Sequence, residues 1–112
     1  MHVIAIAEIF GLSGRRNELV TLLTQTERHV RALAGSRRYV FAARLETPDQ
    51  FVLLSEWETH GAMDAYHRSE HFARYQSELS GLIARPSEMT IYSATNTLRP
   101  VPSGPLDPRD AD

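Results

Sequence analysis

The chain has 112 residues, a formal net charge of −2 and no cysteine. This length predicts a single domain, and its content of 42% hydrophobic and 23% charged residues is ordinary for a globular protein. Without cysteine there is no disulfide, thiol nucleophile or thiolate metal site, and the near-neutral charge gives no sign of a nucleic-acid surface. We see no signal peptide and no apolar run of the roughly 18 residues that a membrane span needs, so we expect a cytoplasmic protein.

The first predicted element is a strand over His2–Phe10, in which both alternating sets of residues are apolar. This pattern predicts a strand buried on both faces. Apolar residues then repeat every three or four positions over about Arg15–Ala34, which predicts an amphipathic helix. Ser13 is placed to cap the start of this helix and Gly35 to end it.

Alternation of apolar residues from Arg38 to Leu45 predicts a second strand. The turn residues Thr47-Pro48-Asp49 follow, so a third strand from Phe51 to Glu58 is expected to pair back as a hairpin. Glu8 is the one charge inside the first strand, and Arg44 on the second strand is its expected partner, because buried carboxylates are rarely left unpaired.

A broken helix is predicted from about His60 to Ile83, with Thr59 capping its start and Ser69 acting as a second N-cap that restarts it. Pro86 stops this helix, and Met89–Thr95 is the predicted fourth strand. Residues 1–96 are expected to form the domain. Residues 97–112 are rich in proline and aspartate, which predicts a disordered tail or an extended arm.

The element order β-α-β-β-α-β predicts an α+β, ferredoxin-like fold with a four-stranded antiparallel sheet and two helices on one face. The first and third strands are apolar on both faces, so a monomer would expose a large apolar patch on the other face of the sheet. We therefore predict a homodimer in which two sheets meet face to face as a dimeric α+β barrel.

Two stretches resemble the antibiotic biosynthesis monooxygenase family, whose members are dimeric α+β barrels. Ile6-Ala7-Glu8-Ile9 is similar to a common first strand of that family, and Trp57 through Phe72 is similar to its pattern of a Trp followed by Ala-His and Ser-Pro-His-Phe. The resemblance covers about Val3 to Ala94. Similar proteins include cofactor-independent monooxygenases of quinols and polyketide phenols, haem-degrading enzymes and isomerases of small signalling sugars.

The resemblance also bears on individual positions. Haem-degrading relatives carry a ligand His at the position of Gln76, so the resemblance implies no haem ligation. Polyketide-oxidising relatives use a Tyr where Met63 stands, and of that set only the Trp is retained, as Trp57. Many members have a His at the position of Tyr66, to which His67 is adjacent here.

The stretch from the third strand into the broken helix predicts a small pocket for an aromatic ligand. Trp57 would be a wall of this pocket or simple core filling, and Tyr66 a hydrogen-bond donor at its rim. His67 or His71 would be the general base, because an imidazole titrates near neutral pH, although either could instead be structural. Substrate contacts are expected from Trp57, Met63, Phe72 and Tyr75.

No cofactor or metal is predicted. The spacing of His67 and His71 suggests a metal pair on an unbroken helix, but no third ligand has suitable spacing with them. The sequence contains no P-loop, no nucleophile elbow and no Rossmann fingerprint. Oxygenation without a cofactor requires an electron-rich substrate, such as a phenolate, hydroquinone or enolate, that itself donates an electron to O2.

The first hypothesis is therefore a homodimeric, cofactor-independent monooxygenase that acts with O2 on a phenolic, quinol or polyketide-type small molecule. The alternatives are a non-catalytic dimer of the same fold that binds a small ligand or serves a structural role, and a non-oxidative isomerase that uses the same base. No nucleic-acid or membrane partner is expected.

Overall fold

The computed structural model describes residues 2–95 of the chain. It contains four strands and three helices in this part of the sequence, and all of the predicted elements are present. Their bounds are β1 His2–Phe10, α1 Arg16–Arg31, β2 Ser36–Ala43, β3 Gln50–Trp57, α2 His60–His67, α3 Glu70–Ser80 and β4 Glu88–Ala94. The tail predicted over residues 97–112 lies outside the described residues.

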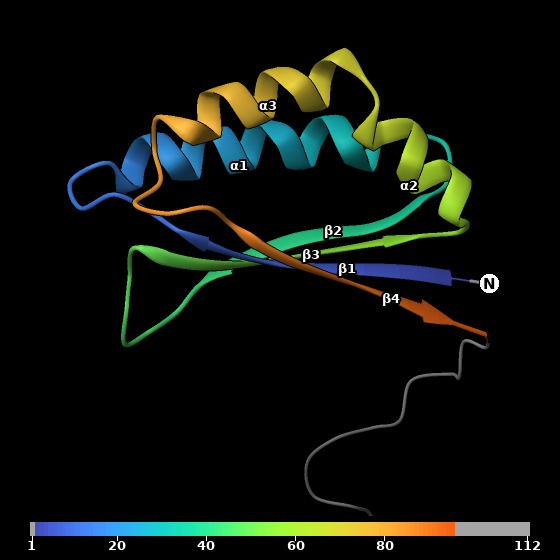
Figure 1. Cartoon of the computed structure of the whole chain (residues 1–112), viewed down its shortest axis with the longest axis horizontal. Coiled ribbons are helices and arrows are strands. Elements are labelled where there is room, and N and C mark those ends of the chain that lie inside the picture. The colour runs from blue at the N-terminus through green and yellow to red at the C-terminus, as the bar shows by residue number, and fades with distance from the viewer. Residues whose placement is uncertain (1, 96–112) are drawn as a thin grey trace, which may run out of the picture.

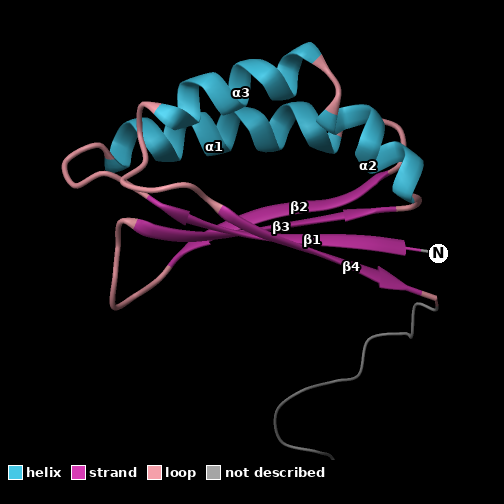
Figure 2. Ribbon diagram, in the orientation of Figure 1, coloured by secondary structure: helices cyan, strands magenta, loops and turns pink. Residues whose placement is uncertain are grey.

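The four strands form one antiparallel sheet in the order β2-β3-β1-β4. Helices α1 and α3 lie side by side across one face of this sheet, and α2 lies at the end where β3 finishes (Figures 1 and 2). No described helix covers the opposite face (Figure 1). This arrangement confirms the predicted α+β, ferredoxin-like fold, with the second predicted helix divided into α2 and α3.

The alternation of side chains in β1 and β3 separates two faces of the sheet. On the helix-covered face, Val3, Ile9, Phe51 and Trp57 are buried almost completely. The alternate positions point to the face that no described helix covers, which we call the bare face. It carries the apolar residues Ile4, Ile6, Phe10, Val40, Val52, Leu54 and Tyr92, placed there by the strand register.

The break in the second helix is confirmed, and side chains cap both of its parts. The Thr59 hydroxyl accepts a hydrogen bond from the Ala62 amide at 3.1 Å, and the Ser69 hydroxyl accepts one from the Phe72 amide at 3.2 Å. These bonds satisfy amides that have no partner within the first turn of a helix. The helix ends earlier than predicted, because α3 stops at Ser80 and Gly81 is its C-cap.

The predicted caps of α1 are wrong. Arg15 rather than Ser13 occupies the N-cap position, without a side-chain hydrogen bond, and Ala32 rather than Gly35 is the C-cap. Gly35 instead lies in the turn just before β2. Its φ angle is +83°, and an added Cβ would come within 2.6 Å of the Ala62 Cβ, so this turn fits closely against α2.

Two further details of the second strand differ from the sequence prediction. Leu45 is fully exposed beyond the end of β2, so the alternation from Arg38 extended the strand too far. Glu8 does pair with Arg44, at 3.6 Å between Oε1 and Nη1, as predicted. The Glu8 side chain is 39% exposed rather than buried, because it lies on the bare face.

No helix in the described part of the chain is long and apolar enough to cross a membrane.

Candidate ligand-binding cavity

A cavity of about 60 Å³ lies between the helix-covered face of the sheet and helices α2 and α3. By this measure it has room for a few water molecules, since one water needs roughly 10–15 Å³. Strands β1, β2 and β3, both helices and the segment entering β4 contribute to it. Its lining comprises Ala5, Ala7, Ile9, Tyr39, Leu53, Ser55, Tyr66, His67, Phe72, Tyr75, Gln76, Leu79, Ser87 and Met89.

The floor of the cavity exists because the central strands carry small residues there. Ala5 and Ala7 of β1 lie on the helix-covered face, and their register partners in β3 are Ser55 and Leu53. On the same face, Val3 and Ile9 fill the two ends of β1. Large side chains at both ends and small ones in the middle leave a space beneath α3 that the core does not fill.

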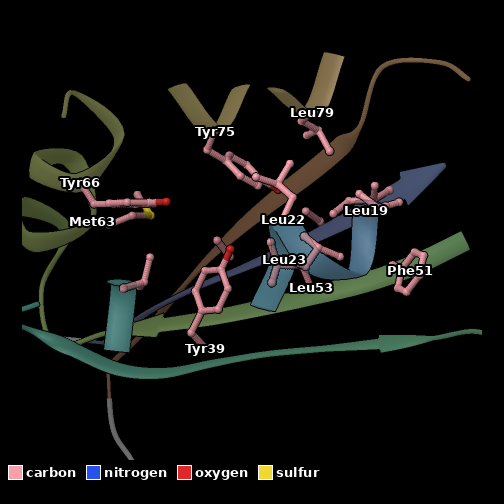
Figure 3. Packing of buried hydrophobic residues seen from close by; sticks show 14 of the residues in the cluster. Leu19, Leu22, Leu23, Tyr39, Phe51, Leu53, Met63, Tyr66, Tyr75 and Leu79 are labelled. Carbon is pink, nitrogen blue, oxygen red and sulfur yellow. The ribbon is translucent and has the colours of Figure 1, made fainter. Parts of the chain in front are cut away.

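Three tyrosines from three different elements surround this space. Tyr39 comes from β2, Tyr66 from α2 and Tyr75 from α3, and all three are buried. The hydroxyls of Tyr39 and Tyr66 point toward the region beneath Tyr75 (Figure 3). Burial raises the pKa of Tyr75 to about 12 and raises the pKa values of Tyr39 and Tyr66 as well, with a further contribution from the neighbouring Tyr75. All three phenols are therefore neutral hydrogen-bond donors at physiological pH.

Two hydroxyls on the lining have no partner among the described residues. The Tyr66 hydroxyl and the Ser87 hydroxyl are buried and form no hydrogen bond with any described residue. An unsatisfied buried polar group costs roughly 1–3 kcal/mol, so such groups normally bind water or a ligand. The cavity thus presents free donors in a mainly apolar lining, an arrangement typical of a small-molecule site.

The two histidines proposed as the base lie in different surroundings. His67, at the end of α2, lines the cavity, and burial lowers its pKa below the usual value. His71 is not among the lining residues. Its ring stacks on His29 of α1, with centroids 3.5 Å apart and an angle of 2° between the ring planes. The two imidazoles diverge because Ser69 interrupts the helix between them.

Trp57 and Met63 lie behind the cavity rather than on its lining. Each is only 1% exposed. The Trp57 indole donates a hydrogen bond to the Ser55 hydroxyl at 3.3 Å, and its ring stacks on Tyr66 with centroids 5.6 Å apart. Trp57 therefore supports two lining residues, while Tyr66, Phe72 and Tyr75 of the sequence prediction reach the lining themselves.

The structure adds lining residues that the sequence did not single out, chiefly Ala5, Ala7, Tyr39, Ser55 and Ser87. In the sequence, Tyr39 stands out only as one residue of an alternating strand. That alternation assigns it to one face of the sheet but does not show that it lines the cavity. The register between β2 and β3 brings Tyr39 to the cavity, because Tyr39 lies opposite the lining residue Ser55. Ser87 lies just before β4 and carries no recognisable pattern.

The cavity adjoins a wider groove of about 500 Å³ between the C-terminal part of α3 and the segment that leads into β4. Gln76, Leu79, Ser87 and Met89 line both spaces. A cavity that holds benzene measures about 150 Å³, so an aromatic ligand cannot fit wholly inside the inner space as it stands. A ligand would place its tip among the tyrosines and the rest of its body in the groove.

The described residues contain no group of three or more His, Asp or Glu side chains that could hold a metal ion.

The model of a known family matches most of the chain. Residues 2–78 match the family described as antibiotic biosynthesis monooxygenase. The chain belongs to this family. Its membership confirms the resemblance seen in Trp57 through Phe72 and supports a monooxygenase-like or small-molecule-binding function at the level of the family.

Solved structures of members and relatives share the fold. A putative antibiotic biosynthesis monooxygenase from Deinococcus radiodurans is 20% identical with a TM-score of 0.83, over 89% of this chain and 99% of the other. A Mycobacterium tuberculosis protein is 24% identical with a TM-score of 0.79, over 87% and 98%. SnoaB, a cofactor-independent oxygenase from Streptomyces nogalater, is 18% identical with a TM-score of 0.77, over 88% and 98%. No match was found among curated proteins.

Proposed function

We propose that this member of the family is a cofactor-independent monooxygenase that acts with O2 on a phenolic, quinol or polyketide-type small molecule. The observation that carries the proposal is the cavity itself, in which His67 and three neutral phenols surround a floor of small residues. The solved structure of a cofactor-independent oxygenase with the same fold supports the reaction class.

His67 is the group on the lining best suited to act as the base. Its lowered pKa keeps the imidazole neutral, and therefore able to accept a proton, at physiological pH. Among the described residues, the inner cavity is lined by no carboxylate and no arginine, so a neutral group of the ligand fits there better than a charged one. The hydroxyls of the three tyrosines and of Ser87 are donors available to the oxygen atoms of this ligand.

The proposed reaction starts when His67 removes the proton of a phenolic or enolic hydroxyl. The resulting anion gives one electron to O2, and the two radicals combine to form a C–O bond. Loss of water from the peroxide then leaves a new carbonyl group. One oxygen atom of O2 stays in the product, and the other leaves as water with two hydrogens from the substrate. The apolar lining would exclude bulk water from this sequence.

A homodimer is part of the proposal. The bare face carries exposed apolar residues, with Val40 45% and Tyr92 52% exposed. Charged pairs on this side, Glu8 with Arg44 and Glu56 with Arg37, form within the chain and leave the apolar centre free. A second copy meeting this face would bury these exposed apolar side chains.

The test is O2 uptake with hydroquinones and electron-rich phenols as substrates, comparing His67→Ala with the wild type. We expect the rate to fall roughly 10²–10⁴-fold, because the step loses its general base. His60→Gln is the matched control, because His60 lies on the same helix, exposed and paired with Asp64 at 3.0 Å. It should keep the wild-type rate. Full turnover by His67→Ala would reject the proposed base.

A second candidate function is ligand binding without turnover. It is favoured by the absence, among the described residues that line the cavity, of any carboxylate to orient His67. Binding of a quinone without O2 uptake by any phenol or quinol would support it. Exchange of a substrate C–H with solvent deuterium, again without O2 uptake, would instead indicate the non-oxidative isomerase.

A further inference from the structure

The stacked histidine pair offers a function that neither the cavity nor the family accounts for. His29 belongs to α1 and His71 to the first turn of α3, and their rings lie parallel with centroids 3.5 Å apart. No pattern in the sequence predicts a role for His29. His29 is an exposed residue, yet its ring contacts His71 across the two helices. These helices, α1 and α3, lie side by side over the sheet (Figure 1).

We propose that His29 and His71 form a pH-responsive clasp that positions α3 over the cavity and releases it when both imidazoles are protonated. We call this pair the histidine clasp. Neutral imidazoles stack through apolar contact of their faces. Two imidazolium ions at the same spacing repel each other, so the second proton opposes the stack.

The surroundings of His71 strengthen this effect. Its Nδ1 atom is buried and has no hydrogen-bond partner among the described residues. Protonation makes both ring nitrogens donors, so Nδ1 would carry an N–H with no acceptor. Burial, then His29, then Arg74 lower the pKa of His71, while Glu78 acts in the opposite direction.

The groups facing the pair come from three helices. His29 is the titratable group from α1, where the nearby Gln25 and Thr26 are uncharged. Arg74 and Glu78 come from α3. From α2, Tyr66 lies beneath both rings, with centroids 6.4 Å from His29 and 6.2 Å from His71, and its raised pKa keeps it neutral.

The lowered pKa of His71 determines whether the histidine clasp loosens in acid or in base. An imidazole that resists protonation in the folded state stabilises the fold above its unfolded pKa of about 6.5. That stabilisation is lost as the pH falls through this value toward the lowered pKa of the folded state. The clasp is therefore closed near neutral pH and loosens in mildly acidic solution.

The histidine clasp is close to the cavity along α3. Phe72 follows His71 directly, and Tyr75 lies one turn further along α3, and both line the cavity. Tyr66 lies between the clasp and Trp57, on which it stacks. If the start of α3 moves away from α1, the tyrosine side of the cavity opens and Trp57 becomes accessible. Only the consequence for ligand entry rests on the proposed function.

The first measurement is quenching of Trp57 fluorescence by acrylamide, without any ligand. Trp57 is the only tryptophan of the chain and is buried, so the signal reports this region alone. We expect the quenching constant to rise at least about twofold between about pH 7.5 and about pH 5, with its midpoint below about 6.5. Far-UV circular dichroism should stay constant. A quenching constant that does not change with pH overturns the proposal.

A double-mutant cycle separates the clasp from His67, whose pKa is also lowered. His29→Gln, His71→Gln and the double variant all retain His67, so its contribution cancels in the cycle. We expect each single variant to lose at least half of the pH response and the double variant to lose no more. Equal pH responses in all four proteins, or strictly additive losses, would overturn the clasp.

His29→Phe keeps an aromatic ring at this position but removes the group that can be protonated. A phenyl ring can stack on neutral His71 and also attracts its cation, so this variant should stay closed at both pH values. His29 is exposed, so the substitution leaves the core intact. If His29→Phe opens in acid as the wild type does, repulsion between two imidazolium ions is not the cause.

The binding rate of 1,4-naphthoquinone, followed by the same fluorescence, tests the link to ligand entry. We expect the rate in the wild type to rise about as much as the quenching constant when the pH is lowered, and to stay constant in His29→Phe. A pH-dependent quenching constant without naphthoquinone binding would retain the clasp and reject the proposed ligand site. Binding whose rate is independent of pH, although quenching responds, would show that the clasp does not control entry.

Discussion

The two faces of the sheet are built from the same strands but have different kinds of surface. On the helix-covered face, β1 carries Ala5 and Ala7 where the cavity lies. On the bare face, the intervening positions are Ile4 and Ile6. Small residues leave space beneath the helices, whereas bulky branched residues make a filled surface. One face therefore fits the proposed small-molecule site and the other the proposed dimer interface.

The largest effect is expected from a charge on the bare face. Leu54→Arg places a charge at the centre of the proposed interface, where burying it unpaired would cost several kcal/mol. We expect the homodimer to dissociate or the chain to unfold, measured by sedimentation velocity and circular dichroism. Leu45→Arg is the control, because Leu45 is fully exposed in the turn after β2. A wild type that sediments as a monomer at micromolar concentration would remove the proposed dimer.

Adjacent residues of β3 give the next comparison. Phe51 points to the helices and is 1% exposed, whereas Val52 points to the bare face and is partly exposed. Phe51→Ala should reduce the free energy of unfolding by about 3–5 kcal/mol, since it leaves a cavity in the core. Val52→Ala should cost roughly 1 kcal/mol within one chain, because fewer contacts are lost. Urea denaturation measures both. Equal costs at low protein concentration would contradict the distinction between the faces.

Filling the cavity has a smaller cost to stability but a specific effect on the site. Ala7→Leu adds side-chain volume to the cavity floor, and overpacking typically costs about 1–3 kcal/mol. We expect it to abolish binding of 1,4-naphthoquinone while the chain stays folded. Ile6→Leu, next to it but on the bare face, is close to conserved in volume and should preserve binding. Retained binding in Ala7→Leu would place the ligand elsewhere.

The sequence predicted the elements better than it predicted the cavity, for a physical reason. Alternation in β1 and the hydroxyl caps at Thr59 and Ser69 are local signals, and the structure confirms them. The cavity depends on register. Whether Ala5 and Ser55 leave a gap is decided only when β1 pairs with β3 and α3 passes over them. The prediction for Leu45 failed because alternation alone does not show where strand pairing ends.

The same distinction between local signals and tertiary contacts explains which features of the histidines the sequence could predict. The spacing of His67 and His71 would place both on one face of an unbroken helix, but the predicted cap at Ser69 breaks the helix between them. No local pattern could show that His71 would meet His29, which is 42 positions earlier in the chain. That contact arises because α1 and α3 pack side by side on the sheet (Figure 2).

The smallest effect is expected at the joint between α2 and α3, which belongs to the helix-covered face alone. The Ser69 hydroxyl donates to the Tyr66 carbonyl at 2.6 Å and accepts from the Phe72 amide at 3.2 Å. Ser69→Ala removes both bonds and should reduce the free energy of unfolding by about 1 kcal/mol. Because Tyr66 and Phe72 line the cavity, naphthoquinone affinity should fall as well.

Thr21→Ala is the matched control for this joint. The Thr21 hydroxyl donates to the Asn17 carbonyl at 2.9 Å on the exposed side of α1, and Thr21 lines neither the cavity nor the groove. Its cost should stay within about 0.5 kcal/mol, as for most surface substitutions, with unchanged affinity. If Ser69→Ala weakens binding no more than Thr21→Ala does, the joint caps a helix without positioning the site, and the shape of the cavity is determined by the sheet below it.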